Sequence, residues 1–202
     1  MKAMLIVTLF GIGLLGPATL ASGFDSYSVH LEPARMSTPC DSTTLSSLRD
    51  FTHRFRGYDY PGGQLTIRDG RNTDTDVLGG VEWVTSLEHQ ESIELNGTPA
   101  VLVVVFSNHV GGSGSATHLL VVRCRQKRLE VIFEAGGGGI HPSPGRGYSY
   151  GADEGLWVTH AIWSPNDSHA DPSREIVEVY RWQPKRERFL LVKKHEQPID
   201  TQ

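Results

Sequence analysis

Residues 92–106 read SIELNGTPAVLVVVF, and this stretch decides the fold. Two apolar-rich runs flank the dipeptide Asn96-Gly97. Asn-Gly favours the positive φ angles of a two-residue type I′ turn, so it predicts a tight β-hairpin. The second arm, residues 100–106, is apolar on both faces. We therefore expect it to be a central strand that is covered on both sides.

Strand patterns continue on both sides of this hairpin. Their connections are short or rich in Gly and Pro, which favours antiparallel neighbours over helical crossovers. Beyond the hairpin, the expected strands cover residues 81–87, 117–124, 129–134, 156–163, 176–182 and 189–194, and residues 64–68 either form a further short strand or belong to a loop.

One segment has helical spacing instead. Leu45, Leu48, Phe51 and Phe55 follow one another at intervals of three, three and four, after several residues that can cap a helix N-terminus. This pattern predicts a helix over residues 41–56. The fold class that follows is mainly β: an antiparallel meander of about seven to eight strands, sandwich or barrel-like, with one N-terminal helix packed against it.

The start of the chain has the pattern of an export signal. Lys2 precedes an apolar run over residues 4–15, and Pro17 and the triplet Thr19-Leu20-Ala21 predict cleavage after Ala21. The alternative is a membrane anchor, but an apolar run of about 12 residues is shorter than the ~20 that a spanning helix needs. We expect a signal peptide over 1–21, a linker over 22–39 and a single mainly-β domain over 40–202. This organisation predicts a secreted or periplasmic protein with no membrane span after cleavage.

The two cysteines, Cys40 and Cys124, both lie in the predicted mature chain. In an oxidising compartment a single disulfide between them is expected. The alternative is two unpaired thiols.

Composition restricts the partners. The chain has 202 residues and a net charge of −4, so it lacks the basic field that attracts nucleic acid. None of its nine histidines lies two, three or four residues from another, so no metal site is expected. No phosphate-binding motif is present either, and we expect no cofactor. A small molecule, a glycan or a protein remain as partners.

Two Gly-rich loops, residues 107–116 and 135–154, are the predicted ligand site. Successive connections of a meander alternate between its ends, so both loops should lie at the same end of the sheet. Arg supplies a forked donor for an anion and Tyr supplies flat apolar area. The alternative is a pair of mobile connectors. The candidate ligand-binding residues are His109, His141, Arg146, Tyr148, Tyr150, Asp153 and Glu154.

His160 alternates with Leu156, Val158 and Ile162, which places it on an apolar strand face. It is either a buried neutral histidine with one hydrogen-bond partner or a titrating group with a perturbed pKa.

Tryptophans and cations suggest two further surfaces. The four tryptophans fall in predicted strands, where they either fill the core or form a platform for sugars. The cations of the last hairpin either protect an edge strand or bind an anionic partner such as a lipid headgroup or an acidic glycan. The tryptophans are Trp83, Trp157, Trp163 and Trp182, and the cations are Arg181, Lys185, Arg186, Arg188, Lys193 and Lys194.

The functional hypothesis is a secreted or periplasmic, non-enzymatic module that binds a ligand or a partner. The alternative is a secreted hydrolase in which His141 or His160 works with Asp153 or Glu154 as an acid–base pair. A histidine and a carboxylate within about 3 Å in a concave pocket would favour the enzyme.

Overall fold

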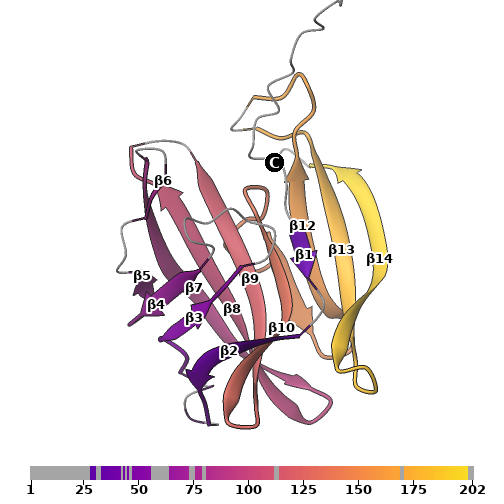
Figure 1. The fold of residues 1–202 in the computed structure, drawn as a ribbon. Coiled ribbons are helices and arrows are strands. Elements are labelled where there is room, and N and C mark those ends of the chain that lie inside the picture. Colours follow the sequence, from indigo (N-terminus) through magenta and orange to yellow (C-terminus); the bar gives the residue numbers. More distant parts are fainter. Residues whose placement is uncertain are drawn as a thin grey trace, which may run out of the picture.

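The computed structural model describes residues 28–30, 33–41, 43, 45, 47–55, 64–72, 76–78, 81–111, 114–168 and 171–199. This part of the chain forms 14 strands in two antiparallel sheets (Figure 1). The mainly-β, antiparallel fold class is therefore confirmed. We call the two sheets the barrel sheet and the outer sheet.

The barrel sheet has ten strands, and its main path runs β3-β4-β5-β7-β8-β9-β10. β1 and β2 pair with β10, and β6 pairs with β7. β2 also lies against β3, so the sheet curls into a nearly closed barrel (Figure 1). The strands are β1 (Ser28–His30), β2 (Ala34–Pro39), β3 (Phe51–His53), β4 (Leu65–Arg68), β5 (Arg71–Asn72), β6 (Asp76–Leu78), β7 (Val81–Leu95), β8 (Thr98–His109), β9 (Ser115–Arg125) and β10 (Arg128–Gly137).

The outer sheet is a four-stranded meander in the order β11-β12-β13-β14, with β14 at its edge. Its strands are β11 (Tyr148–Gly151), β12 (Gly155–Ile162), β13 (Arg174–Gln183) and β14 (Arg188–Pro198).

The predicted hairpin is confirmed. Asn96 and Gly97 have φ angles of 51° and 80° and join β7 to β8. β8 lies between β7 and β9, and its residues 100–105 are buried on both faces.

Alternation along β8, β9 and β10 divides these buried residues between two cores. One core fills the barrel and the other lies between the barrel sheet and the outer sheet. The barrel core contains Met36, Cys40, Leu45, Leu48, Phe51, Phe55, Leu65, Ile67, Val101, Val103, Val105, Leu120, Val122, Leu129 and Val131. The intersheet core contains Ile93, Leu95, Ala100, Leu102, Val104, Leu119, Val121, Ile132, Phe133, Ala135, Ile140, Tyr148, Leu156, Val158, Tyr180 and Phe189.

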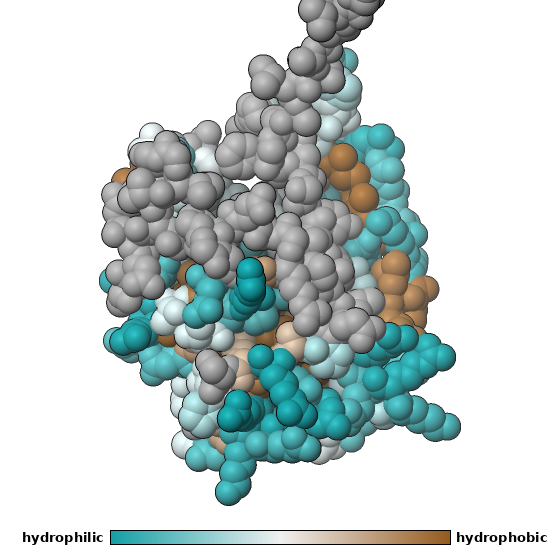
Figure 2. All heavy atoms as spheres, viewed as in Figure 1, coloured by the Kyte–Doolittle hydropathy of each residue, from teal (hydrophilic) through white to brown (hydrophobic). Residues whose placement is uncertain are grey.

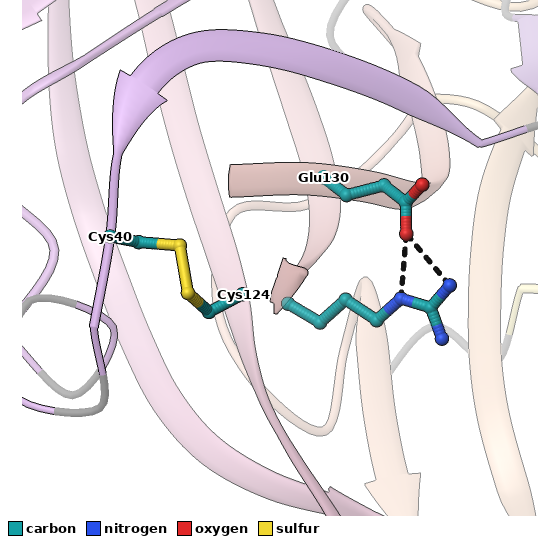
Figure 3. The surroundings of a disulfide bond; sticks show 4 residues. Cys40, Cys124 and Glu130 are labelled. Carbon is teal, nitrogen blue, oxygen red and sulfur yellow. Dashed lines mark hydrogen bonds and ion pairs between the residues drawn. A yellow bond between two sulfur atoms is a disulfide. The ribbon is translucent and has the colours of Figure 1, made fainter. Parts of the chain in front are cut away.

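The predicted disulfide is present. Cys40, directly after β2, is bonded to Cys124 of β9, with a Cα–Cα distance of 5.8 Å (Figure 3). The N–H of Cys40 also donates a hydrogen bond to the carbonyl oxygen of Lys127 at 3.1 Å. The bridge therefore holds the N-terminal segment against the β9–β10 hairpin.

The helix predicted over residues 41–56 is not confirmed. Thr43 and Leu45 are helical, but Phe51–His53 form strand β3, so a helix does not continue to residue 56. All four apolar residues of the predicted face are nevertheless buried in the barrel core. The pattern identified buried positions correctly and assigned the wrong backbone conformation to the second half of the segment.

Part of the segment expected as a linker, residues 22–39, forms strands β1 and β2 on β10. The predicted signal peptide, residues 1–21, lies outside the described residues. Within the described ranges, no helix has the length and apolar character needed to cross a bilayer.

Candidate functional site

The two Gly-rich loops begin at the same end of the barrel sheet, as the meander predicts. Gly137, at the end of β10, is the register partner of Thr117, near the start of β9. Thr117 is in turn the partner of Phe106, near the end of β8. The parity argument is therefore confirmed for the starts of the two loops.

The second loop does not remain at that end. Tyr148 lies beside His89 of β7, with a ring centroid distance of 6.1 Å. The Tyr150 hydroxyl donates a hydrogen bond to the carbonyl oxygen of Glu94 at 2.7 Å, next to the turn at the opposite end of β7. Asp153 and Glu154 follow in the exposed turn between β11 and β12.

The structure therefore separates the seven predicted ligand-binding residues. His109 stacks on Trp83 at the end of β8, with ring centroids 5.6 Å apart. His141 and Arg146 are exposed in the connection to β11. The pKa of His141 is lowered, mainly by partial loss of solvent around the ring and secondly by the positive charge of Arg146. Only Glu154 lines the depression described below.

Glycines in the second loop have a packing role. A Cβ on Gly139 would lie 2.7 Å from the carbonyl oxygen of Ala161 in β12. The same glycine accepts a hydrogen bond from the Ala161 N–H at 2.8 Å, and Gly147 accepts one from the Thr159 N–H at 2.9 Å. Gly139 thus brings the loop backbone against β12 where a side chain would not fit, and a Cβ on Gly147 would overlap the backbone of His141 within the loop.

Three histidine–carboxylate pairs exist among the described residues, and none uses the predicted carboxylates. One, His89–Glu91 on β7, is half-exposed and its Nε2–Oε2 distance is 3.9 Å; the other two are buried. Inside the barrel, His53 Nε2 lies 2.8 Å from Glu134 Oε2, and both side chains are about 95% buried, with 4% and 5% exposed. His118 shares this interior and packs on Phe55, with ring centroids 4.3 Å apart. Burial lowers the pKa of His118 to about 4, against an opposing effect of Glu134.

The second buried pair lies in the outer sheet. His160 is buried, as its strand pattern predicts, and its Nε2 lies 3.5 Å from Glu178 Oε2. Glu178 also accepts a hydrogen bond from the Tyr180 hydroxyl at 2.6 Å and pairs with Lys194 at 2.8 Å. Burial lowers the pKa of His160. Burial alone would raise the pKa of Glu178, but its hydrogen bonds from His160, Lys194 and Tyr180 prevail and lower it.

The outward face of the outer sheet carries an open depression of about 650 Å³. Its lining contains no histidine and no hydroxyl or thiol nucleophile. The lining residues are Glu154, Trp157, Val179, Arg181, Val192 and Lys193. We call this feature the Trp157 depression.

The strand register explains how this depression forms. Trp157, Val179 and Lys193 are register partners on β12, β13 and β14, so their side chains form one row across the sheet. Beside this row, Gly151 and Gly155 are partners on β11 and β12 and contribute no side chains. A bulge between Val179 and Tyr180 also shifts the register with β14. The space beside these glycines is taken up by the side chains of Glu154 and Arg181, which line the depression together with Trp157.

The charges around the hollow are mainly positive. Lys193 Nζ lies 5.9 Å from the ring centroid of Trp157. Arg181 and Lys193 are both exposed, and neither forms an ion pair with a residue in the part of the chain that the structure describes. Figure 2 also shows exposed hydrophobic surface on the side of the molecule where β13 and β14 lie in Figure 1. Leu191 and Val192 are 45% and 50% exposed.

The four tryptophans do not all fill the core. Trp83, Trp157, Trp163 and Trp182 are all partly exposed. Trp182 packs against the intersheet core, whereas Trp157 belongs to the outward face.

The described residues contain no cluster of three or more His, Cys, Asp or Glu side chains arranged to hold a metal ion. No protein-family model, curated protein or solved structure matches this chain.

Proposed function

We propose that this protein is a non-enzymatic, exported binding module whose ligand site is the Trp157 depression. The observation that supports the proposal is the combination in one hollow of a partly exposed indole, one carboxylate and two cations that have no ion-pair partner among the described residues. An aromatic ring with a few convergent polar groups is the usual composition of a small-ligand site. The disulfide supports export, because such bonds persist in oxidising compartments.

The composition of the depression favours binding over catalysis. Glu154 is its one carboxylate, and the lining has no histidine to pair with it. The two buried histidine–carboxylate pairs lie elsewhere, in the barrel and in the outer sheet. General acid–base catalysis requires the acid or base within hydrogen-bond reach of the substrate. A site on the outward face gives a ligand no such contact with either histidine.

The proposal is tested by a thermal-shift screen of the purified protein with oligosaccharides and peptides, followed by two tryptophan variants. We expect a ligand that stabilises the wild-type protein and Trp163→Ala but not Trp157→Ala. Trp163 is the matched control because it is partly exposed and does not line the depression. A ligand that still binds Trp157→Ala with unchanged affinity, or that is chemically converted by the protein, would overturn the proposal.

A further inference from the structure

We infer that the ligand of the Trp157 depression is an acidic saccharide, with a uronic-acid carboxylate held between Arg181 and Lys193. This inference rests on the proposed function and adds the ligand class. It uses the charge balance of the last hairpin, the environment of the indole and the shape of the hollow.

Cations are concentrated in the β13–β14 hairpin. Residues 174–198 contain seven Lys and Arg against four Asp and Glu, whereas the whole chain contains 19 against 23. Arg174 pairs with Glu196, and Lys194 pairs with Glu178. Arg181 and Lys193 are the cations of this hairpin that line the depression. A ligand carboxylate would supply their counter-charge, and the guanidinium fork matches its two oxygens.

The indole supplies the second contact. The apolar face of a pyranose ring packs on a flat aromatic ring, as the large apolar area of Trp allows. Lys193 Nζ lies over Trp157 in the free protein, but a cation–π contact at an exposed site is weak. The flexible Lys193 side chain can therefore turn toward a carboxylate and leave the ring face to the sugar.

Glu154 orients the ligand. An ionised carboxylate only accepts hydrogen bonds, so Glu154 can accept them from sugar hydroxyls and repels the sugar carboxylate. Glu154 lies in the turn that joins β11 to β12. Arg181, on β13, lies beside Gly155 of β12. The acidic end of the sugar is thus directed to Arg181 and Lys193, and its hydroxyls to Glu154.

The shape of the surface favours a saccharide over an anionic membrane. A volume of about 650 Å³ falls within the usual range of small-ligand pockets, about 300–1,000 Å³. Trp157 forms part of its lining, so a sugar ring that enters the hollow can pack on the indole. An anionic bilayer surface is flat and would leave this hollow unfilled.

The test is isothermal titration calorimetry of the purified protein at low salt with three trisaccharides: trigalacturonate, its methyl ester and maltotriose. We expect trigalacturonate to bind, with an affinity that falls as salt rises. The methyl ester and maltotriose should bind about tenfold more weakly or worse, because each lacks the charge that strengthens hydrogen bonds to Arg. Arg181→Ala should bind trigalacturonate at least about tenfold more weakly than the wild-type protein, and Lys193→Ala should lose less affinity. Lys185 is an exposed lysine of the same hairpin outside the lining, so Lys185→Ala should bind with unchanged affinity.

The other outcomes separate the ligand class from the site. Equal binding of the acid, the ester and maltotriose, lost in Trp157→Ala, would overturn the acidic class and leave the proposed function standing. Binding to phosphatidylserine vesicles without binding to trigalacturonate would overturn the saccharide. Trigalacturonate binding that survives both Trp157→Ala and Arg181→Ala would show that the site itself is wrong.

Discussion

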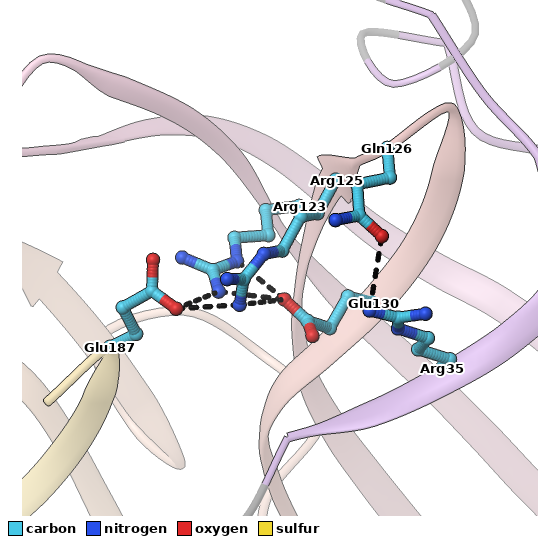
Figure 4. Close-up of polar contacts among 6 residues, drawn as sticks. All are labelled: Arg35, Arg123, Arg125, Gln126, Glu130 and Glu187. Carbon is cyan, nitrogen blue, oxygen red and sulfur yellow. Dashed lines mark hydrogen bonds and ion pairs between the residues drawn. The ribbon is translucent and has the colours of Figure 1, made fainter.

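Arg123 and Glu130 form a buried ion pair across β9 and β10. They are register partners, each is only 5% exposed, and the Arg123 Nε donates a hydrogen bond to Glu130 Oε2 at 2.7 Å (Figure 4). The Arg123 guanidinium also lies 5.5 Å from the ring of Trp182 and 3.4 Å from Glu187 Oε2. Since Trp182 and Glu187 belong to the β13–β14 hairpin, this pair links the barrel sheet to the outer sheet.

Replacing one member of this pair should lower the free energy of unfolding far more than replacing both. Arg123→Met leaves the Glu130 carboxylate buried without its main partner, which should destabilise the protein by about 3–5 kcal/mol. The double variant Arg123→Met/Glu130→Leu should recover much of this loss, because no buried charge remains. Urea denaturation of both variants measures the difference.

Glu187→Gln is the control for this comparison. Its side chain is 45% exposed, so its ion pairs should contribute less than about 1 kcal/mol. A double variant no more stable than Arg123→Met alone would contradict the argument.

The disulfide should contribute strongly because it joins residues 84 positions apart. Closing a loop of this length lowers the entropy of the unfolded chain and so raises the free energy of unfolding by about 4 kcal/mol. We expect Cys40→Ser/Cys124→Ser to lower the free energy of unfolding by about that amount. Urea titrations of the wild-type protein with and without reductant should differ in the same direction. Identical midpoints in these two titrations would show that the bridge does not stabilise the fold.

Local sequence signals predicted the parts of the fold that depend on neighbouring residues. Asn96-Gly97 sets its own backbone angles, and the apolar run over residues 100–106 identified β8 as a covered strand. The segment around Phe51 was assigned to a helix because spacing in short apolar segments does not separate helix from strand. There, pairing with β4 determines the conformation.

The site was less predictable because its contacts are not local. His53 and Glu134 are 81 residues apart, and nothing in either segment indicates the other. The Trp157 depression depends on Trp157 facing Val179 and on Lys193 facing Val179, which requires the strand register. The alternation of β12 did place His160 on the buried face, since that depends only on its neighbours along the strand.

Gly155 should tolerate no side chain. Its φ is +93°, and a Cβ there would overlap the carbonyl oxygen of Tyr180. We expect Gly155→Ala to destabilise the protein by about 3 kcal/mol or more, from backbone strain and the steric overlap together. Gly97→Ala is the matched control, because its φ is +80° and nothing lies within 4 Å of the added Cβ. Strain alone should cost about 1–2 kcal/mol there. Equal losses in the two variants, measured by urea denaturation, would refute the steric contribution.

His118 makes the fold sensitive to acid from inside the barrel. It is fully enclosed beside Phe55, and a Cβ on Gly136 would lie only 2.6 Å from its Nδ1. Burial favours the neutral imidazole, with a smaller contribution in the same direction from His53.

The pKa of His118 predicts the pH range in which stability is lost. This pKa is about 4 in the folded protein, against the ordinary histidine value of 6.5 in an unfolded chain. The unfolded chain therefore binds a proton first as the pH falls. Stability is fully present above pH 6.5 and decreases toward pH 4 by about 3 kcal/mol. His118→Leu should flatten this part of the curve of unfolding free energy against pH, even if the variant is less stable at pH 7. His141→Ala, which removes an exposed histidine with a smaller downward pKa shift, should change the slope much less than His118→Leu does. Urea denaturation at half-unit steps from pH 7 to pH 4 measures all three slopes, and a His118→Leu slope equal to that of the wild type would contradict this assignment.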